Sequence, residues 1–287
     1  MHQIKLGGVG PSVSELALGC MRLCNLDTKA AESLLRTAME QGINFFDHAD
    51  IYGKGGSESL FASALGMAPS LRGQIVIQTK CAIHDGMYDF SKEHILKSVE
   101  CSLRRLQTDY IDILLLHRPD TLMEPEEVAE AFAALRQSGK VRYFGVSNQN
   151  AAQMALLQSA LGEKLLVNQL QFGLAHTGII DAGFNVNMKN EPGSYGMAAS
   201  SNIAVSTGLP SRHGRRFNTA FSGAYFSIIQ LIRSSTARWK RLPEKNKPLK
   251  ARSQSVGFCA IRQIYSRSSA PPAGSICLRC AAHRTSH

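Results

Sequence analysis

Four side chains that can exchange or hold protons follow successive apolar segments of the sequence. They are a carboxylate, a phenol, an amine and an imidazole, and they stand at Asp47, Tyr52, Lys80 and His117. Each alone is weak evidence, because a charged group after an apolar segment is usually solvated and a single histidine there is usually a satisfied core residue. Brought together, the four types could transfer a proton to or from a reacting group, as general acid–base catalysis requires.

The apolar segments that precede these residues alternate with amphipathic ones. Short apolar runs predict strands at residues 14–19, 43–46, 74–79, 110–116, 142–146 and 164–169. The spacing of apolar residues predicts helices at 28–41, 58–65, 91–106, 124–138 and 150–161. Nearly continuous apolar strands that alternate with helices indicate a parallel sheet buried on both faces, in an α/β fold.

The number of strand–helix units favours a (β/α)8 barrel over an open sheet. Six units follow one another, and Gly7, Gly8 and Gly10 precede the first strand, where they predict a turn rather than a dinucleotide-binding loop. In such a barrel the carboxyl ends of the strands line one mouth, where active sites are built. The four residues are therefore expected at one mouth, together with residues that end the fifth and sixth strands.

Local motifs then resemble a known family. GINFFDHADIYG, VIQTKC, YIDILLLHRPD and YFGVSNQ resemble the aldo-keto reductases, most closely bacterial monomeric members, over roughly residues 1–194. The resemblance implies a (β/α)8 barrel that reduces aldehydes or ketones to alcohols with a nicotinamide cofactor. That cofactor is usually NADPH, with NADH not excluded, and it is bound without a Rossmann domain. The substrate itself is left open.

The resemblance also implies a role for each of the four residues. Tyr52 would donate a proton to the carbonyl oxygen. A free phenol has a pKa of about 10, so the ammonium group of Lys80 would have to lower it. Asp47 would pair with Lys80 and position it, and His117 would orient the carbonyl and stabilise the charge that develops on its oxygen.

Five further residues are implied to bind the cofactor. By resemblance, the nicotinamide carboxamide would be held by Ser147, Asn148 and Gln169, and the backbone of Gly19 and Met21 would lie under the cofactor.

Each of these residues also has a structural interpretation. Asp47 and Lys80 could form an ordinary buried ion pair, and Tyr52 could line a wall. Asn148 could cap the helix that follows it, and Gln169 fits a structural role as well as a binding one.

Beyond residue 194 the composition changes. Residues 195–287 hold 15 basic residues, one acidic residue and 15 serines, a net charge of +14, whereas residues 1–194 hold 17 basic and 21 acidic residues, a net charge of −4. No strand–helix alternation continues in this part. We therefore expect two regions: a barrel-like domain over 1–194, and a basic, Ser-rich, disordered or poorly folded tail over 195–287.

A shifted reading frame would explain this tail. In that frame each restored codon takes its last two bases from the first two bases of an observed codon. Three segments can then be rewritten to resemble the family's sixth helix, seventh strand and eighth strand: 196–204, 205–224 and 257–273. We expect a frameshift or sequencing error near codon 195. The expected barrel is incomplete, with strands seven and eight lost and two open sheet edges. Weak cofactor binding and low stability would follow, because phosphate sites lie after those strands.

Hydropathy and cysteine spacing argue against membrane, secreted and metal-binding classes of protein. There is no run of about 18 apolar residues and no basic start followed by a long apolar run, so neither a membrane span nor a secretory signal is expected. Seven irregularly spaced cysteines fit a reducing cytoplasm. Cys277 and Cys280 with His283 and His287 resemble half a metal site, but no second cysteine pair is near, so no metal is expected.

These features favour a monomeric cytoplasmic enzyme that acts on a small carbonyl substrate, without a nucleic-acid partner. The alternative is an inactive barrel fragment whose basic, disordered tail binds nucleic acid or acidic partners. Carbonyl-dependent oxidation of NADPH would favour the enzyme, and salt-sensitive DNA binding without turnover would favour the fragment.

Overall fold

The computed structural model describes residues 1–84, 86–171, 204–208 and 224–227. The chain divides into two compact units, Met1–Thr236 and Ala237–His287. Every described residue lies in the first unit, so the predicted tail falls outside the described residues except for two short strands. Among the described residues, no helix combines the length and the apolar character that a bilayer crossing needs.

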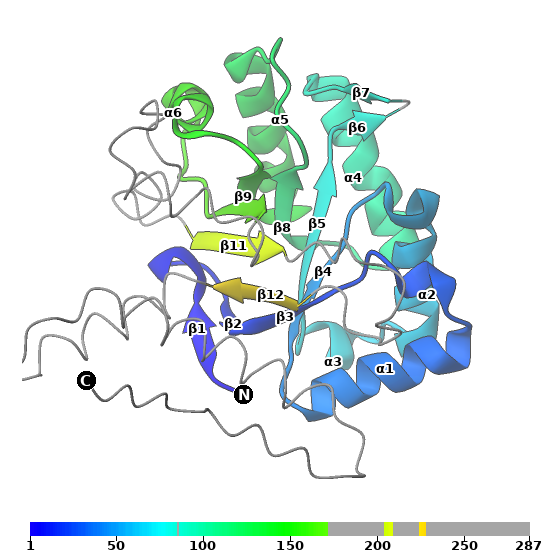
Figure 1. Ribbon diagram of the computed structural model, residues 1–287. Coiled ribbons are helices and arrows are strands. Elements are labelled where there is room, and N and C mark those ends of the chain that lie inside the picture. The colour runs from blue at the N-terminus through cyan, green and yellow to red at the C-terminus, as the bar shows by residue number, and fades with distance from the viewer. Residues whose placement is uncertain (85, 172–203, 209–223, 228–287) are drawn as a thin grey trace, which may run out of the picture. The chain divides into compact units, whose positions relative to one another are not determined.

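Six parallel strands form the greater part of a barrel, as the sequence predicts (Figure 1). In spatial order they are β3 (Leu16–Gly19), β4 (Phe45–Asp47), β5 (Val76–Cys81), β8 (Ile111–Leu116), β9 (Val141–Ser147) and β10 (Val167–Gln171). Every residue of β4, β5 and β8 is buried. This burial on both faces explains why these strands read as largely apolar runs, and their polar residues are themselves buried: Asp47, Gln78, Thr79, Lys80 and Asp112.

Two short strands close the barrel, which corrects one expectation. β11 (Ala204–Gly208) pairs in parallel with β10, and β12 (Ala224–Ser227) pairs with both β11 and β3. The expected open edges at the first and sixth strands are therefore wrong, because both strands have a hydrogen-bonded neighbour. β12 runs antiparallel to both of its neighbours, whereas every strand of a regular (β/α)8 barrel is parallel, so the regular pattern ends after six units.

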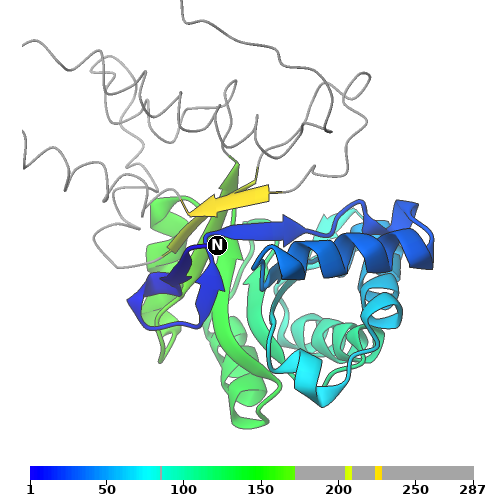
Figure 2. The same ribbon diagram turned by 90° about the horizontal axis from the view of Figure 1, so that it is seen from below.

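Helices follow the strands and lie outside them (Figure 2). They are α1 (Thr28–Glu40), α2 (Gly56–Leu65), α3 (Pro69–Arg72), α4 (Lys92–Leu106), α5 (Pro125–Gln137) and α6 (Ala151–Ala160), with 3-10 turns η1 (Leu6–Gly8), η2 (Leu23–Asn25) and η3 (Tyr52–Gly55). All five predicted helices are present, with small differences at their ends. The Asp27 and Ser91 side chains cap α1 and α4 by accepting hydrogen bonds from backbone N–H groups, which fixes where these helices begin.

An N-terminal hairpin covers the amino end of the barrel. It consists of β1 (Gln3–Lys5) and β2 (Ser12–Ser14), joined by the predicted glycine turn. Ile4 and Val13 of this hairpin belong to one buried cluster with Phe45 and Val76, which lie at the amino ends of β4 and β5. A Cβ atom at Gly10 would lie 2.9 Å from the backbone carbonyl oxygen of Leu6 and 2.7 Å from a methyl carbon of Leu166, so only glycine permits this close packing.

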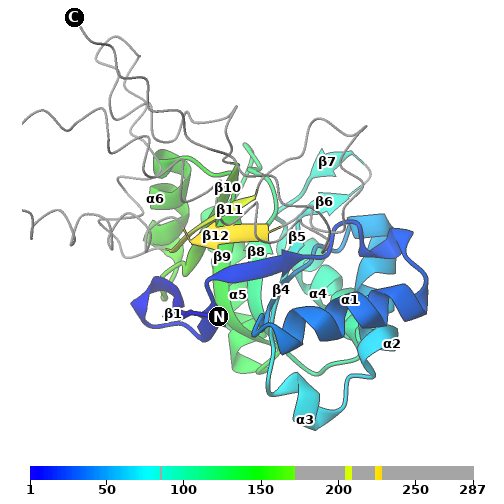
Figure 3. The ribbon, with the colours of Figure 1, turned by 60° about the horizontal axis from the view of Figure 1, so that its bottom comes forward.

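A second hairpin lies at the opposite end. β6 (Ile83–His84) and β7 (Met87–Tyr88) follow the carboxyl end of β5 and precede α4 (Figure 3). Since the amino end is covered by the first hairpin, the carboxyl end is the mouth of the barrel.

Buried charge also fixes the amino ends of the strands. A guanidinium N–H of Arg72 donates to Asp112 Oδ2 at 2.7 Å, and the same oxygen accepts the backbone N–H of Ile77 at 2.9 Å. Arg142 lies 3.3 Å from the other oxygen of Asp112. Asp112 thus ties α3 and β5 to β8, which is a structural role.

Candidate active site

The structure brings three of the four predicted residues into direct contact at the mouth of the barrel. The Nζ atom of Lys80, on β5, lies 2.8 Å from Asp47 Oδ2 at the end of β4. The same nitrogen lies 3.1 Å from the hydroxyl oxygen of Tyr52, which begins the 3-10 turn η3. It also donates to the backbone carbonyl of His48 at 2.7 Å. One ammonium group therefore connects the carboxylate to the phenol.

The three side chains are held away from water. Lys80 is 1% exposed, Asp47 is fully buried and Tyr52 is 9% exposed. Burial alone would lower the pKa of Lys80, but the Asp47 carboxylate and the Tyr52 oxygen favour the charged form and raise it above its ordinary value. Lys80 is thus charged near neutral pH, next to the phenol.

The fourth residue, His117, packs against Tyr52. It follows β8, and the two rings meet edge to face, with centroids 5.9 Å apart and planes at 83°. Burial and the charge of Lys80 lower the pKa of His117 to about 3, so the imidazole is neutral. Within the described part of the chain, the buried Nδ1 atom of His117 has no hydrogen-bond partner. A neutral imidazole in this position can donate or accept one hydrogen bond.

Two amides hold the carboxylate from the other side. The side-chain amide of Gln78 donates to Asp47 Oδ1 at 2.5 Å, and that of Gln169 lies 3.3 Å from the same atom. Sequence reasoning missed Gln78. A signal was present, because Gln78 and Lys80 are two residues apart on one strand and therefore point to the same side.

Three of the predicted cofactor residues form a connected set at the ends of β9 and β10. The Ser147 hydroxyl donates to the backbone carbonyl of Gln169 at 3.0 Å, and the Asn148 side-chain amide donates to Ser147 Oγ at 2.8 Å. Asn148 is half-buried and has a φ of 58°, a left-handed conformation that asparagine tolerates well.

The alternative role for Asn148, as a helix cap, is wrong. Asn150 caps α6 instead, and it forms a reciprocal capping box with Gln153.

The remaining two predicted residues lie at the end of the first barrel strand. Gly19 pairs in register with Asp47, which puts the backbone of Gly19 beside that of Asp47. Met21 is two residues further on, with a side chain that is 47% exposed. Neither makes a described side-chain contact with the group of four.

A second buried polar group lies next to the site and was also missed. Glu58 on α2 is fully buried, where it accepts hydrogen bonds from Thr79 at 2.6 Å and from Arg105 at 2.7 Å. Burial and the charge of Glu58 raise the pKa of Asp50 to about 7. Asp50 is therefore only partly ionised near neutral pH, although the positive charges of Arg105 and Lys80 act to lower its pKa.

The described residues fit one end of a nicotinamide cofactor. Asn148 offers a half-buried amide at the mouth, and the buried His117 Nδ1 atom requires a polar partner that the described chain does not supply. An adenosine phosphate would lie after the seventh and eighth strands, and residues 209–223 and 228–287 are outside the described residues.

An α/β barrel with a polar, buried group of acid, amine, phenol and imidazole at the carboxyl ends of its strands defines a barrel enzyme. The sequence model of the aldo/keto reductase family matches residues 15–208, and the chain belongs to that family. The match extends past the predicted boundary at residue 194 and ends with β11.

Three similar proteins carry the names of oxidoreductases or reductases. An oxidoreductase of Bacillus subtilis, YcsN, is 50% identical over 170 residues, which cover 55% of this chain and 57% of the relative. The oxidoreductase YdhF of Escherichia coli is 42% identical over 61% of this chain and 62% of its own. A 6-dehydroglucose reductase of Agrobacterium fabrum is 40% identical over 58% and 60%. The chain thus spans 57–62% of the length of these relatives.

Solved structures agree on the fold. A glycerol dehydrogenase of Gluconobacter oxydans superposes with a TM-score of 0.60 at 26% identity, over 71% of this chain and 62% of the other. An aldo-keto reductase of Bacillus halodurans in its holo form gives a TM-score of 0.59 at 27% identity, over 86% and 78%.

Proposed function

We propose that this protein reduces an aldehyde or ketone to an alcohol with NADPH as the hydride donor. The observation that carries the proposal is the position of Lys80 Nζ, within hydrogen-bond distance of both Asp47 and Tyr52. Family membership supports oxidoreductase chemistry, and the coenzyme and the carbonyl substrate are the parts proposed here.

Reduction of a carbonyl requires a hydride at carbon and a proton at oxygen. NADPH supplies the hydride when bound. Tyr52 supplies the proton from its hydroxyl, and the oxygen left behind carries a negative charge 3.1 Å from the Lys80 ammonium. Attraction between these charges lowers the cost of releasing the proton. Asp47 keeps Lys80 charged and in place, because its Oδ2 atom accepts a hydrogen bond from the same nitrogen at 2.8 Å.

His117 orients the carbonyl group. Because its imidazole is neutral, a ring N–H can donate to the carbonyl oxygen without competing for the proton that Tyr52 transfers. Its packing against Tyr52 brings both donors to the same oxygen. Edge-to-face packing between the two rings also limits the rotation of each.

Ser147, Asn148 and Gln169 would hold the nicotinamide carboxamide, and the backbone of Gly19 and Met21 would lie under the ring. Asn148 is the member best placed for direct contact, since it is half-buried whereas Ser147 and Gln169 are buried and bonded to each other.

For the C-terminal region, we propose that the sequence is translated in a shifted reading frame. Support comes from its charge of +14 and from the strand–helix alternation of the sequence, which does not continue beyond residue 194. The family match ends at residue 208, a short distance beyond the proposed position. The curated relatives cover only 55–61% of this chain. We propose a single-base insertion, deletion or sequencing error near codon 195, with reduced cofactor affinity of the chain as written as its consequence.

The test is the oxidation of NADPH by the full chain with a panel of aldehydes and ketones. Tyr52→Phe should lower kcat by about 100-fold or more, because it removes the proton donor. Tyr88→Phe is the matched control, since Tyr88 is 52% exposed on β7, and it should retain the parent rate. Equal rates for the Tyr52→Phe variant and the parent, or no carbonyl-dependent oxidation by the parent, would contradict the proposal. Salt-sensitive DNA binding without turnover would support the alternative of a fragment with a nucleic-acid-binding tail.

A further inference from the structure

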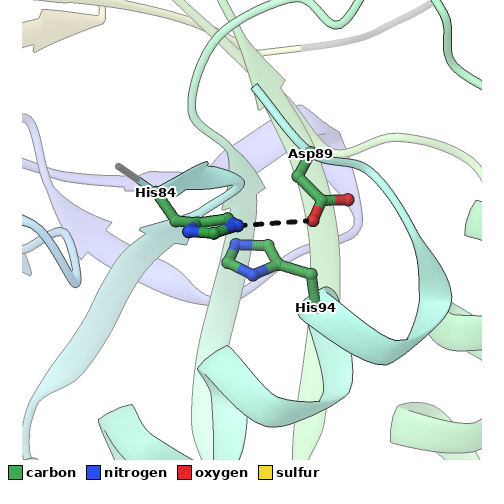
Figure 4. A group of neighbouring side chains, drawn as sticks. All are labelled: His84, Asp89 and His94. Carbon is green, nitrogen blue, oxygen red and sulfur yellow. Dashed lines mark ion pairs between the residues drawn. The ribbon is translucent and has the colours of Figure 1, made fainter. Parts of the chain in front are cut away.

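Three metal-ligating side chains meet outside the active site. His84 lies on β6, Asp89 directly follows β7 and His94 lies in the first turn of α4. One potential ligand atom from each lies within 4.8 Å of the other two. Figure 4 shows the two imidazole rings one over the other, beside the carboxylate. The ring centroids are 5.0 Å apart with planes at 25°, and His84 Nε2 lies 3.9 Å from Asp89 Oδ2.

The carboxylate is positioned with one oxygen fixed and the other facing the histidines. Asp89 Oδ1 accepts the backbone N–H of Ser91 at 2.8 Å, at the start of α4. This hydrogen bond limits the rotation of the carboxylate and leaves Oδ2 on the side of His84. Hydrogen bonds of this kind orient ligands in metal sites.

The ligand types select the kind of ion. Two imidazoles and one carboxylate are the set that zinc and similar divalent transition metals prefer, whereas calcium and magnesium prefer oxygen alone. We propose that His84, Asp89 and His94 bind a Zn²⁺ ion, with solvent in the fourth position.

Closure onto an ion needs the ligand atoms to approach one another and the two stacked imidazole rings, whose planes lie at 25°, to turn so that their nitrogen lone pairs converge. Tetrahedral zinc holds its nitrogen and oxygen ligands roughly 3.3 Å from one another, compared with separations of up to 4.8 Å here. The side chains of His84 and Asp89 are 41% and 31% exposed, so both can move towards an ion from solvent. The nearby positive charge of Lys97 opposes a cation, and the Asp89 carboxylate offsets it.

The ion would join the β6–β7 hairpin to α4. Both lie beyond the carboxyl end of β5, the strand that carries Lys80, so the ion would fix one side of the barrel mouth. The site is separate from the catalytic group, and the proposal does not depend on the reaction.

The experiment is calorimetric titration of the chelator-treated full chain with ZnCl2. His84→Ala and His94→Ala should each weaken one binding event by at least about tenfold, because each removes a ligand. Asp89→Asn should weaken the same event, since the amide keeps an oxygen to accept the Ser91 N–H but loses the charge. Circular dichroism confirms that each variant is folded like the parent.

Two controls distinguish this site from other ligands. His2→Ala removes an exposed histidine that also lies near a carboxylate, Glu15, and should leave the binding event unchanged. Cys277→Ser tests the cysteine pair of the C-terminal region and should also leave it unchanged. The proposal is overturned if His84→Ala and His94→Ala bind Zn²⁺ as tightly as the parent, or if only Cys277→Ser weakens binding.

Discussion

The carboxylate of Asp47 and the ammonium of Lys80 lie 2.8 Å apart, with both side chains 1% exposed. These two charges come from adjacent parallel strands and have almost no contact with water. Each compensates the other, since an isolated charge in this position would carry a large desolvation cost. The pair is therefore both the centre of the proposed chemistry and a condition for the stability of the barrel.

Removal of one partner should destabilise the fold strongly. Asp47→Ala leaves Lys80 buried without its carboxylate, and we expect the free energy of unfolding to fall by about 3–5 kcal/mol. Urea denaturation followed by circular dichroism measures this change. Glu32→Ala is the control, because it breaks the exposed Glu32–Arg36 pair on α1 and should cost no more than about 1 kcal/mol. Equal losses of unfolding free energy in the two variants would show that the Asp47–Lys80 pair is not buried.

The buried Asp50 should make stability depend on pH. Its pKa is raised from 3.8 to about 7, chiefly by burial, so the folded state keeps a proton that the unfolded state has released between these values. The free energy of unfolding should therefore fall as the pH rises from 3.8 to about 7. Asp50→Asn removes this loss of stability. The difference in free energy of unfolding between the variant and the parent should therefore grow in favour of the variant by up to about 4 kcal/mol between pH 3.8 and about 7.

Denaturation curves at a series of pH values test this expectation. Asp109→Asn removes one acidic charge at an exposed position and should keep the pH profile of the parent. A difference in free energy of unfolding between Asp50→Asn and the parent that stays constant over this pH range would exclude a raised pKa at Asp50.

Two neighbouring asparagines should separate binding from stability. Asn148→Gly keeps the left-handed backbone, and we expect NADPH to bind about two- to tenfold more weakly while stability changes by less than about 0.5 kcal/mol. Asn150→Ala removes the cap of α6 and should cost about 1 kcal/mol of stability without an effect on binding. Fluorescence titration with NADPH and urea denaturation of both variants provide the measurements. Weaker NADPH binding by Asn150→Ala, together with a loss of stability in Asn148→Gly, would contradict these assignments.

The reading frame can be tested directly on the gene. Across codons 190–200 the nucleotide sequence should permit a shifted frame that continues without stop codons and encodes strand–helix alternation. Early stop codons in that frame would exclude the hypothesis. With the frame restored, the chain should bind NADPH more tightly than the present chain, because phosphate sites of such barrels lie after the last two strands.

The sequence predicted the parallel barrel because its signals are local. Apolar runs such as 110–116 and helical spacing such as that of 28–41 arise within single elements, so neither requires knowledge of a partner. Convergence of Asp47, Lys80 and His117 also followed, since the carboxyl ends of parallel strands meet at one edge. Tyr52 joins them through the short turn η3.

Tertiary structure alone decided which side chains touch. The contacts of Gln78 with Asp47, and of Glu58 with Thr79 and Arg105, depend on strand register and helix placement, which no short segment encodes. The His84–Asp89–His94 group lies close in sequence, but it depends on how the β6–β7 hairpin turns into α4. Closure by β12 was likewise not predictable, since an antiparallel strand contradicts the pattern of the preceding six units. Chain periodicity determines which elements form, but contacts across 20 or more residues depend on how those elements pack in space.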